Sequence, residues 1–376
     1  MAPELPAERR AADRLALWLQ ALALGLPPTP EDHARQLAAQ RALGEQLFQD
    51  VLVPGLGPDF GAQLAAAQTP LAGLAATEFR RMAAAAHWLA RGLHGLHASE
   101  GAPGATAEAG EASARCAVWL TLAAAVIDQK VDDGELSGDV VRQHLNPAAF
   151  LAAIEPGGAP LRVPGQPLIE VLLANTTSQI AARLRAGSSD FDAMVAAELR
   201  VCLTEMIVGQ LDSPYLRIHP LSDLDHVEQT LRRVNTLTTW IPAYLSLLGA
   251  PRPSEPTLRA VRQVTTKLGE VGWALDALSD IHADLQAGVW SWMWLTVARH
   301  DGPHARWLRE HQDAPERALA ALEACSATTT RLTQIALAID EIGRTPHVNP
   351  AAAAELVAFC RYMVWSFLFT APPEPA

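Results

Sequence analysis

Apolar side chains recur at every third or fourth position along most of the chain, which is the spacing of one face of an α-helix. Strict alternation of apolar and polar residues, the usual sign of a strand, is nearly absent. The pattern predicts an all-α fold of about ten helices. The periodic segments are Ala11–Leu24, Glu31–Val51, Leu71–Leu96, Ala112–Val131, Leu168–Leu184, Asp190–Leu211, Leu224–Leu248, Thr257–Leu285, Pro315–Ile342 and Ala351–Phe369.

Segments rich in glycine and proline separate the predicted helices. They are Ser99–Thr106, Glu155–Pro167, Ala250–Pro256 and the tail Ala371–Ala376. None is long enough for a linker between domains, and no repeat of fixed period is visible. We therefore expect one all-α domain over residues 1–376, with N-terminal helices in 1–70, a central cavity in the bundle, and a disordered tail at 371–376.

The composition narrows the function classes. Hydrophobic residues make up 49% of the chain and charged residues 19%, which is too apolar for a disordered protein. The formal net charge of −12 argues against nucleic acid or an anionic membrane as the main partner. The four cysteines are far apart and form no C-x-x-C pair, so a reducing cytoplasm is expected rather than a disulfide framework or a zinc site.

No segment predicts stable insertion into a membrane. The N-terminus is polar and mixed in charge, unlike a secretory signal. The longest uninterrupted apolar run, Cys116–Ile127, has 12 residues, which is too short to cross a bilayer and typical of a buried helix. The expected protein is soluble and cytoplasmic.

A first acidic cluster lies where helix electrostatics disfavours it. Asp128 and Asp132 are four residues apart, and Asp133 adjoins them, at the end of an apolar helix that Gly134 should terminate. Negative charge at a helix C-terminus opposes the helix dipole, at a cost of a few tenths of a kcal/mol. A solvated helix end is the simpler interpretation, and a functional site is the alternative.

A second acidic cluster follows in Thr257–Leu285. Asp276, Asp280 and Asp284 stand at i, i+4 and i+8 and form one ridge, with no cation four residues away. A solvated face would explain this ridge alone. Two such carboxylate rows facing each other across a cavity would instead bind Mg²⁺, a hard cation that bridges to substrate phosphates.

These motifs resemble those of the trans-isoprenyl diphosphate synthase superfamily, the class I all-α fold of prenyltransferases and terpene cyclases. The similarity covers about 200 residues and is best from Gly209 to Gly288. Gly209-Gln210 resembles the family's G-Q motif, and Asn235-Thr236 resembles its Lys-Thr pair. Lys267 precedes Asp276 at the spacing of the family's lysine before its second aspartate-rich motif. Further upstream, Asp128–Asp133 matches the first motif, and Arg80 and Arg81 lie near the position of the family's early arginine.

The departures from the family pattern bear on the reaction. Gln129 and Ala277 replace the second aspartate of the two motifs, and Asn235 replaces the lysine before Thr236. The double arginine after the first motif and the G-G-K motif are absent. In the family these basic groups hold two diphosphates, so their loss implies a single allylic diphosphate, as in a terpene synthase, a lyase of isoprenoid biosynthesis. The N-D-x-x-S-x-x-x-E motif of ordinary microbial cyclases is also absent.

The resemblance implies a set of site residues. Mg²⁺ would be held by Asp128, Asp132, Asp133, Asp276, Asp280 and Asp284. Positive charge for the leaving diphosphate would come from Lys267, Arg80, Arg81 and Arg232, and the cavity wall would include Gln210 and Asn235. Trp119 and Trp273 would stabilise a carbocation through their indole faces. The small residues Ala123 and Ala124 imply a substrate of 15 carbons or more.

Other functions remain open from the sequence. A chain-elongating or head-to-head condensing prenyltransferase would carry similar motifs, and a non-catalytic partner subunit would keep the fold without the reaction. An unrelated helical bundle is a further alternative. The family fold is compatible with a homodimer. His94 and His97, three residues apart, read as residues of a partly exposed helix rather than metal ligands.

Overall fold

The computed structural model describes residues 16–66, 70–98, 105–212, 223–235, 237–279, 291–300 and 327–369. Within these residues the regular structure is helical, apart from one isolated β-bridge between Leu71 and Leu74. The all-α prediction is confirmed. The helices are α2 (Pro30–Leu47), η1 (Phe48–Leu52, a π-helical turn), α3 (Val53–Gly55), α4 (Gly57–Ala66), α5 (Ala76–Gly95), α6 (Ala105–Asp132), α7 (Gly138–His144), α8 (Pro147–Ile154), α9 (Pro167–Ala186), α10 (Asp190–Asp212), α11 (Leu224–Asn235), α12 (Leu237–Leu247), α13 (Glu255–Ser279), α15 (Trp292–His300), α18 (Ala327–Arg344) and α19 (Pro350–Phe369).

The structure differs from the predicted elements in several places, including α3 and α4, which no predicted periodic segment covers. The segment expected as one helix over Leu224–Leu248 is divided into α11 and α12. The short helices α7 and α8 were not expected, although each begins at a polar N-cap whose side chain accepts a backbone hydrogen bond, Ser137 and Asn146 respectively. Helices this short carry too few periodic positions to be recognised from hydrophobicity alone.

Helix α6 ends as its sequence predicts. Gly134 adopts a φ of +72°, which a side-chain-bearing residue rarely tolerates. The backbone N–H of Leu136 donates to the carbonyl of Lys130, and that of Gly134 donates to the carbonyl of Val131. This glycine-terminated end places Asp128 in the last turns of the helix, at its negative pole.

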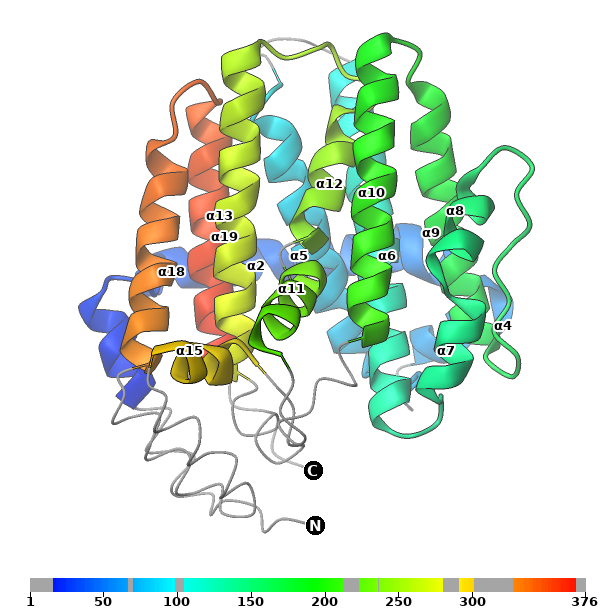
Figure 1. The fold of residues 1–376 in the computed structure, drawn as a ribbon, viewed down its shortest axis with the longest axis horizontal. Coiled ribbons are helices and arrows are strands. Elements are labelled where there is room, and N and C mark those ends of the chain that lie inside the picture. Colours follow the sequence, from blue (N-terminus) through cyan, green and yellow to red (C-terminus); the bar gives the residue numbers. More distant parts are fainter. Residues whose placement is uncertain are drawn as a thin grey trace.

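Long helices run side by side and share one end of the molecule. The C-terminal ends of α10 and α13 lie at the bottom of Figure 1, where α6 also ends. Helix α12 packs between them, against α6, α10 and α13. The G-Q motif, Asp128 of the first aspartate-rich motif and Asp276 of the second therefore lie at the same end of the bundle.

The buried side chains form two hydrophobic clusters. One gathers around α13, α15, α18 and α19, and the other around α5, α6, α9, α10 and α12. Buried polar groups join the second cluster at the end of α12, where Ser113 and Arg183 donate hydrogen bonds to the carbonyl of Leu245. These bonds satisfy a helix-terminal carbonyl that has no partner within α12.

The stretch Ala107–Val131 of α6 is long and apolar enough to cross a membrane by length and composition. In the structure, 61% of its most apolar window is buried inside the protein, as in the core helix of a globular fold. The described residues thus give only weak support for a membrane span.

Candidate active site

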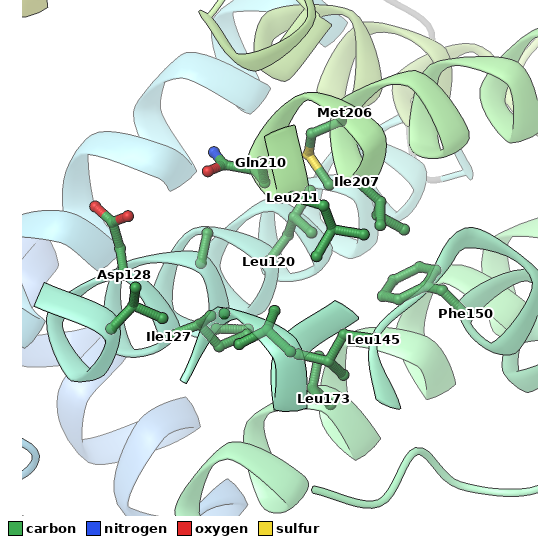
Figure 2. A pocket seen from close by; sticks show the side chains of 15 residues that line it. Leu120, Ile127, Asp128, Leu145, Phe150, Leu173, Met206, Ile207, Gln210 and Leu211 are labelled. Carbon is green, nitrogen blue, oxygen red and sulfur yellow. The ribbon is translucent and has the colours of Figure 1, made fainter. Parts of the chain in front are cut away.

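A predominantly apolar cavity of about 120 Å³ lies between α6, α7, α8, α9 and α10. Helix α6 contributes one wall and α10 the opposite wall, while α8 and α9 close the inner end. Figure 2 shows the side chains that surround it. They are Leu120, Ala123, Ala124, Ile127, Asp128, Val131, Gly138, Val141, Leu145, Phe150, Leu173, Met206, Ile207, Gln210 and Leu211.

Two polar side chains occupy one edge of this cavity. Asp128 from α6 and Gln210 from α10 lie on the same side of it in Figure 2, away from Leu145, Phe150 and Leu173. Asp128 and Ala124, one helical turn earlier, are both exposed to solvent. The cavity therefore has a polar rim open to water and an apolar interior, an arrangement suited to a ligand with a charged head and a hydrocarbon tail.

An arginine that the sequence analysis did not single out fixes one side of the cavity. Arg142 of α7 donates to the carbonyl of Leu211 at 2.8 Å, and its guanidinium lies 3.6 Å from the carboxylate of Asp212. These contacts attach α7 to the last turn of α10, beside Gln210. Nothing local in the sequence signals such a pairing, because the two partners are separated by about seventy residues.

The second aspartate-rich motif lies at the end of α13. Asp276 is partly buried, and the backbone beside Gly272, one turn earlier, faces open space. The hydroxyl of Ser279 donates to the carbonyl of Asp276 at 2.9 Å. Asp280 and Asp284 lie outside the described residues, so the predicted ridge can be followed only to its first member.

The other two aspartates of the first motif, Asp132 and Asp133, are described to different extents. Asp132 is the last residue of α6, and its side chain is not described. Asp133 accepts a hydrogen bond from Gln129 at 3.1 Å and approaches the turn at Gly73. Across the described part of the chain, no three His, Cys, Asp or Glu side chains gather as a metal site. Magnesium ligation stays a prediction that rests on Asp128 and Asp276.

Three of the predicted catalytic residues line a different cavity. Lys267, Arg232 and Trp273 surround a space of about 390 Å³ between α11, α13, α15 and α18. The ammonium of Lys267 lies 2.9 Å from Glu270 and 3.1 Å from Glu341. Partial burial opposes the charge, but hydrogen bonds and attraction from the two glutamates raise the pKa of Lys267 above its usual value.

The early arginines and Trp119 make packing contacts. The Nε of Arg80 lies 2.7 Å from Glu45, and its guanidinium stacks on the Phe48 ring at 3.7 Å, which attaches α5 to α2 and η1. Arg81 is exposed. Trp119 is buried against the backbone of Gly55, where an added Cβ would lie 2.4 Å from the indole. Asn235 ends α11, and its side chain is not described.

His94 and His97 are more enclosed than the sequence suggested. His94 is buried and hydrogen-bonds through Nδ1 to the carbonyl of Ser246 at 3.3 Å. His97 hydrogen-bonds through Nε2 to the Ser246 hydroxyl at 3.1 Å. Burial, together with neighbouring His94, lowers the pKa of His97 to about 3. Both histidines serve to join α5 to α12.

Three solved structures match this fold over most of the chain. Heptaprenyl diphosphate synthase from Staphylococcus aureus aligns with a TM-score of 0.55 and 11% identity, over 86% of this chain and 98% of that one. Geranylgeranyl pyrophosphate synthase from Lactobacillus brevis aligns with a TM-score of 0.51 and 15% identity, over 88% of this chain and 97% of that one. Geranylgeranyl pyrophosphate synthase from Corynebacterium glutamicum aligns with a TM-score of 0.50 and 14% identity, over 93% of this chain and 98% of that one.

This likeness establishes that the chain has the fold of trans-prenyl diphosphate synthases. No family model and no curated protein matches the sequence. At such low identity the shared fold does not transfer a reaction, which has to be argued from the site.

Proposed function

We propose that the protein is a class I terpene synthase, which ionises one allylic prenyl diphosphate with the help of Mg²⁺ and releases pyrophosphate. The observation that carries the proposal is the apolar cavity whose open rim bears Asp128 and Gln210. A prenyl diphosphate has the matching form, with a multiply charged anionic head and a long hydrocarbon tail.

The rim suits a magnesium–diphosphate group. Carboxylate and amide oxygens are hard donors of the kind that Mg²⁺ accepts, and Asp128 presents its carboxylate to solvent. Asp128 would hold the metal from α6, and Asp276 would hold it from α13 at the same end of the bundle. When bound, Mg²⁺ supplies charge neutralisation for the leaving diphosphate.

The cavity interior would control the carbocation that remains. Side chains of Leu120, Ile127, Phe150 and Leu173 leave few oxygen nucleophiles near the tail. Exclusion of water by such walls protects a reactive cation from early quenching. Ala123 and Ala124 both lie on the wall, and their small side chains support the proposal of a substrate with 15 carbons or more.

A chain-elongating prenyltransferase is the second candidate. It is favoured by the fold, since the three solved structures compared above are of prenyl diphosphate synthases. It is disfavoured by the basic side chains, because Lys267 is engaged by two glutamates and Arg232 is paired with Glu228 at 2.7 Å. Those pairs leave less positive charge for a second diphosphate.

One experiment separates the two candidates. The purified protein is incubated with geranyl, farnesyl and geranylgeranyl diphosphate and Mg²⁺, with and without labelled isopentenyl diphosphate. Hydrocarbons or alcohols detected by gas chromatography, without label, are the expected result. Label in a longer diphosphate would establish the elongating enzyme instead. Absence of any pyrophosphate release under all conditions would leave the non-catalytic partner subunit.

A further inference from the structure

A second cavity lies on another side of α13, where α13 packs against α15 and α18. It has a volume of about 390 Å³, is partly open to solvent, and is lined by residues of α11, α13, α15 and α18. None of its lining residues belongs to the apolar cavity between α6 and α10. Its polar lining includes Arg331 of α18, whose environment differs from that of the other cations there.

Arg331 is a buried cation without a carboxylate partner. Only 5% of its surface is exposed. Its terminal nitrogens donate to neutral groups: the carbonyl of Trp292 at 2.9 Å, the amide oxygen of Gln334 at 2.7 Å, and the hydroxyl of Thr296. No Asp or Glu of the described chain lies within ion-pair distance of it. By contrast, Lys267 and Arg299, which line the same cavity, each contact two carboxylates.

Two donors beside this cavity lack an acceptor in the described part of the chain. The Nε–H of Arg331 and the indole N–H of Trp292 are both buried and make no hydrogen bond there. A buried donor without an acceptor is unfavourable. Neither nitrogen has surface that a group in the cavity could touch, so an anion there compensates the charge of Arg331 and reaches these donors only if the side chains shift.

The guanidinium keeps its charge despite burial. Loss of hydration lowers the pKa of Arg331 to about 10, so the group is still protonated at neutral pH. The ring of Trp273 lies 4.5 Å from the guanidinium carbon and compensates the charge in part. A buried charge otherwise needs a counter-charge, which the described residues do not provide.

The surrounding contacts hold Arg331 in place. Trp273 and Trp292 stack with ring centroids 4.1 Å apart, and the guanidinium lies over this pair. The hydrogen bonds to Gln334 and Thr296 restrict its rotation further. A cation positioned in this way before binding loses little conformational entropy when an anion arrives.

We propose that this second cavity is a binding site for a phosphoryl anion, with Arg331 as its anchor. A phosphoryl group beside the guanidinium supplies the counter-charge that the described residues do not provide. The other cations that line the cavity, Arg232, Lys267 and Arg299, are paired with its glutamates, so Arg331 is the cation left to bind an added anion. The group is either free pyrophosphate or phosphate, or the head of an esterified diphosphate.

The test is a calorimetric titration of the full chain in the presence of a chelator, which removes metal-dependent binding to the aspartates. The probes are inorganic phosphate, inorganic pyrophosphate and geranyl diphosphate. Saturable binding to wild type is expected, and Arg331→Gln should weaken it by about tenfold or more. Arg344→Gln is the matched control, because Arg344 lies on the same helix, is exposed, and is paired with Asp340. That control should bind as wild type does.

The outcomes decide the proposal and its source. If the binding that depends on Arg331 is tightest for pyrophosphate, the ligand is the free anion. If it is tightest for geranyl diphosphate, the ligand is the head of an esterified diphosphate. If Arg331→Gln does not fold, Arg331→Lys is compared, which keeps the charge but lacks the planar, forked guanidinium; binding about threefold weaker or more is expected. Absence of saturable binding, or equal binding by these variants, overturns the proposal. Asp276→Asn should retain this binding, so the result is independent of the proposed reaction.

Discussion

The polar chemistry of the apolar cavity depends on very few side chains. Asp128 brings a carboxylate to the end of a helix whose dipole opposes it, and the neighbouring cavity wall is apolar. The neighbouring Lys130 is paired with Glu135. A carboxylate at this end of a helix is slightly unfavourable for stability, and its place beside an apolar cavity is typical of a functional residue.

Replacement of Asp128 tests this role. Asp128→Asn should lower turnover of prenyl diphosphates by roughly a hundredfold or more, because an amide binds Mg²⁺ far less well than a carboxylate. Asp139→Asn is the control, since Asp139 is exposed in the first turn of α7 and does not line the cavity. The rate of pyrophosphate release, measured for both variants at saturating Mg²⁺, tests this expectation. Equal activity of the two variants would exclude Asp128 from the site.

Phe150 is expected to limit the length of the prenyl tail. Its ring, buried in α8, lies on the cavity side away from Asp128. Phe150→Leu should shift the preference towards the longer substrate, measured as the ratio of kcat/KM for geranylgeranyl and farnesyl diphosphate. A change of about threefold or more is expected for one altered apolar contact. Phe79→Leu alters a buried phenylalanine outside the cavity and should leave this ratio unchanged.

The partly buried His97 makes the free energy of unfolding depend on pH. The pKa of His97 is about 3 in the folded protein, whereas an exposed histidine titrates near about 6.5. Between these values the unfolded chain binds more protons, so the free energy of unfolding falls as the pH is lowered through this range. Between pH 7 and pH 4.5 this change amounts to about 2.5 kcal/mol, which His97→Gln should remove. Urea denaturation of wild type and His97→Gln at pH 7 and pH 4.5 measures the change in unfolding free energy. The same change in both proteins would contradict the low pKa of His97.

At the scale of the helices, replacing two glycines by alanine should have opposite effects on the stability of the protein. Gly209 of the G-Q motif lies where α10 meets α11, and an added Cβ would be 2.9 Å from the backbone nitrogen of Val234. No described residue lies within 4 Å of the position of a Cβ added at Gly272 in α13. Gly209→Ala should destabilise the protein by roughly 1–3 kcal/mol through overpacking.

Gly272→Ala should instead stabilise it by about 0.5–1 kcal/mol, because alanine favours the helix interior. Chemical denaturation of the two variants beside wild type gives both values. Destabilisation by Gly272→Ala would mean that space beside α13 is occupied in solution. A neutral Gly209→Ala would mean that α10 and α11 separate readily.

At the scale of the whole molecule, we expect the fold to be independent of the Mg²⁺ that the proposed reaction needs. Two hydrophobic clusters hold the described helices together, and these helices contain no cluster of three metal-ligating side chains. Chelation should therefore abolish turnover, yet shift the unfolding temperature by less than about 2 °C. Thermal unfolding followed by circular dichroism, with and without chelator, measures the shift in unfolding temperature. The activity assay under the same conditions measures the loss of turnover. A large fall in melting temperature would reveal a structural metal.

The helical architecture was predictable from the sequence because its cause is local. The spacing of apolar residues specified the long helices α9, α10 and α19 nearly to their ends, and Gly134 marked the end of α6. The unusual position of Asp128 was also visible, since it depends only on distance from a helix end. Short helices such as α7 and α8 escaped, because tertiary contacts rather than periodicity stabilise them.

What surrounds each side chain was decided by the tertiary structure alone. Residues of equal appearance in the sequence have different surroundings: Asp128 lies on the cavity rim, whereas Asp133 accepts a hydrogen bond from Gln129. Lys267 and Arg232 proved to face a cavity distinct from that of Gln210, and Phe150, Arg142 and Arg331 carried no signal at all. The physical reason is that a cavity is formed by segments distant in the chain, and packing between helices, unlike helix formation, has no local code.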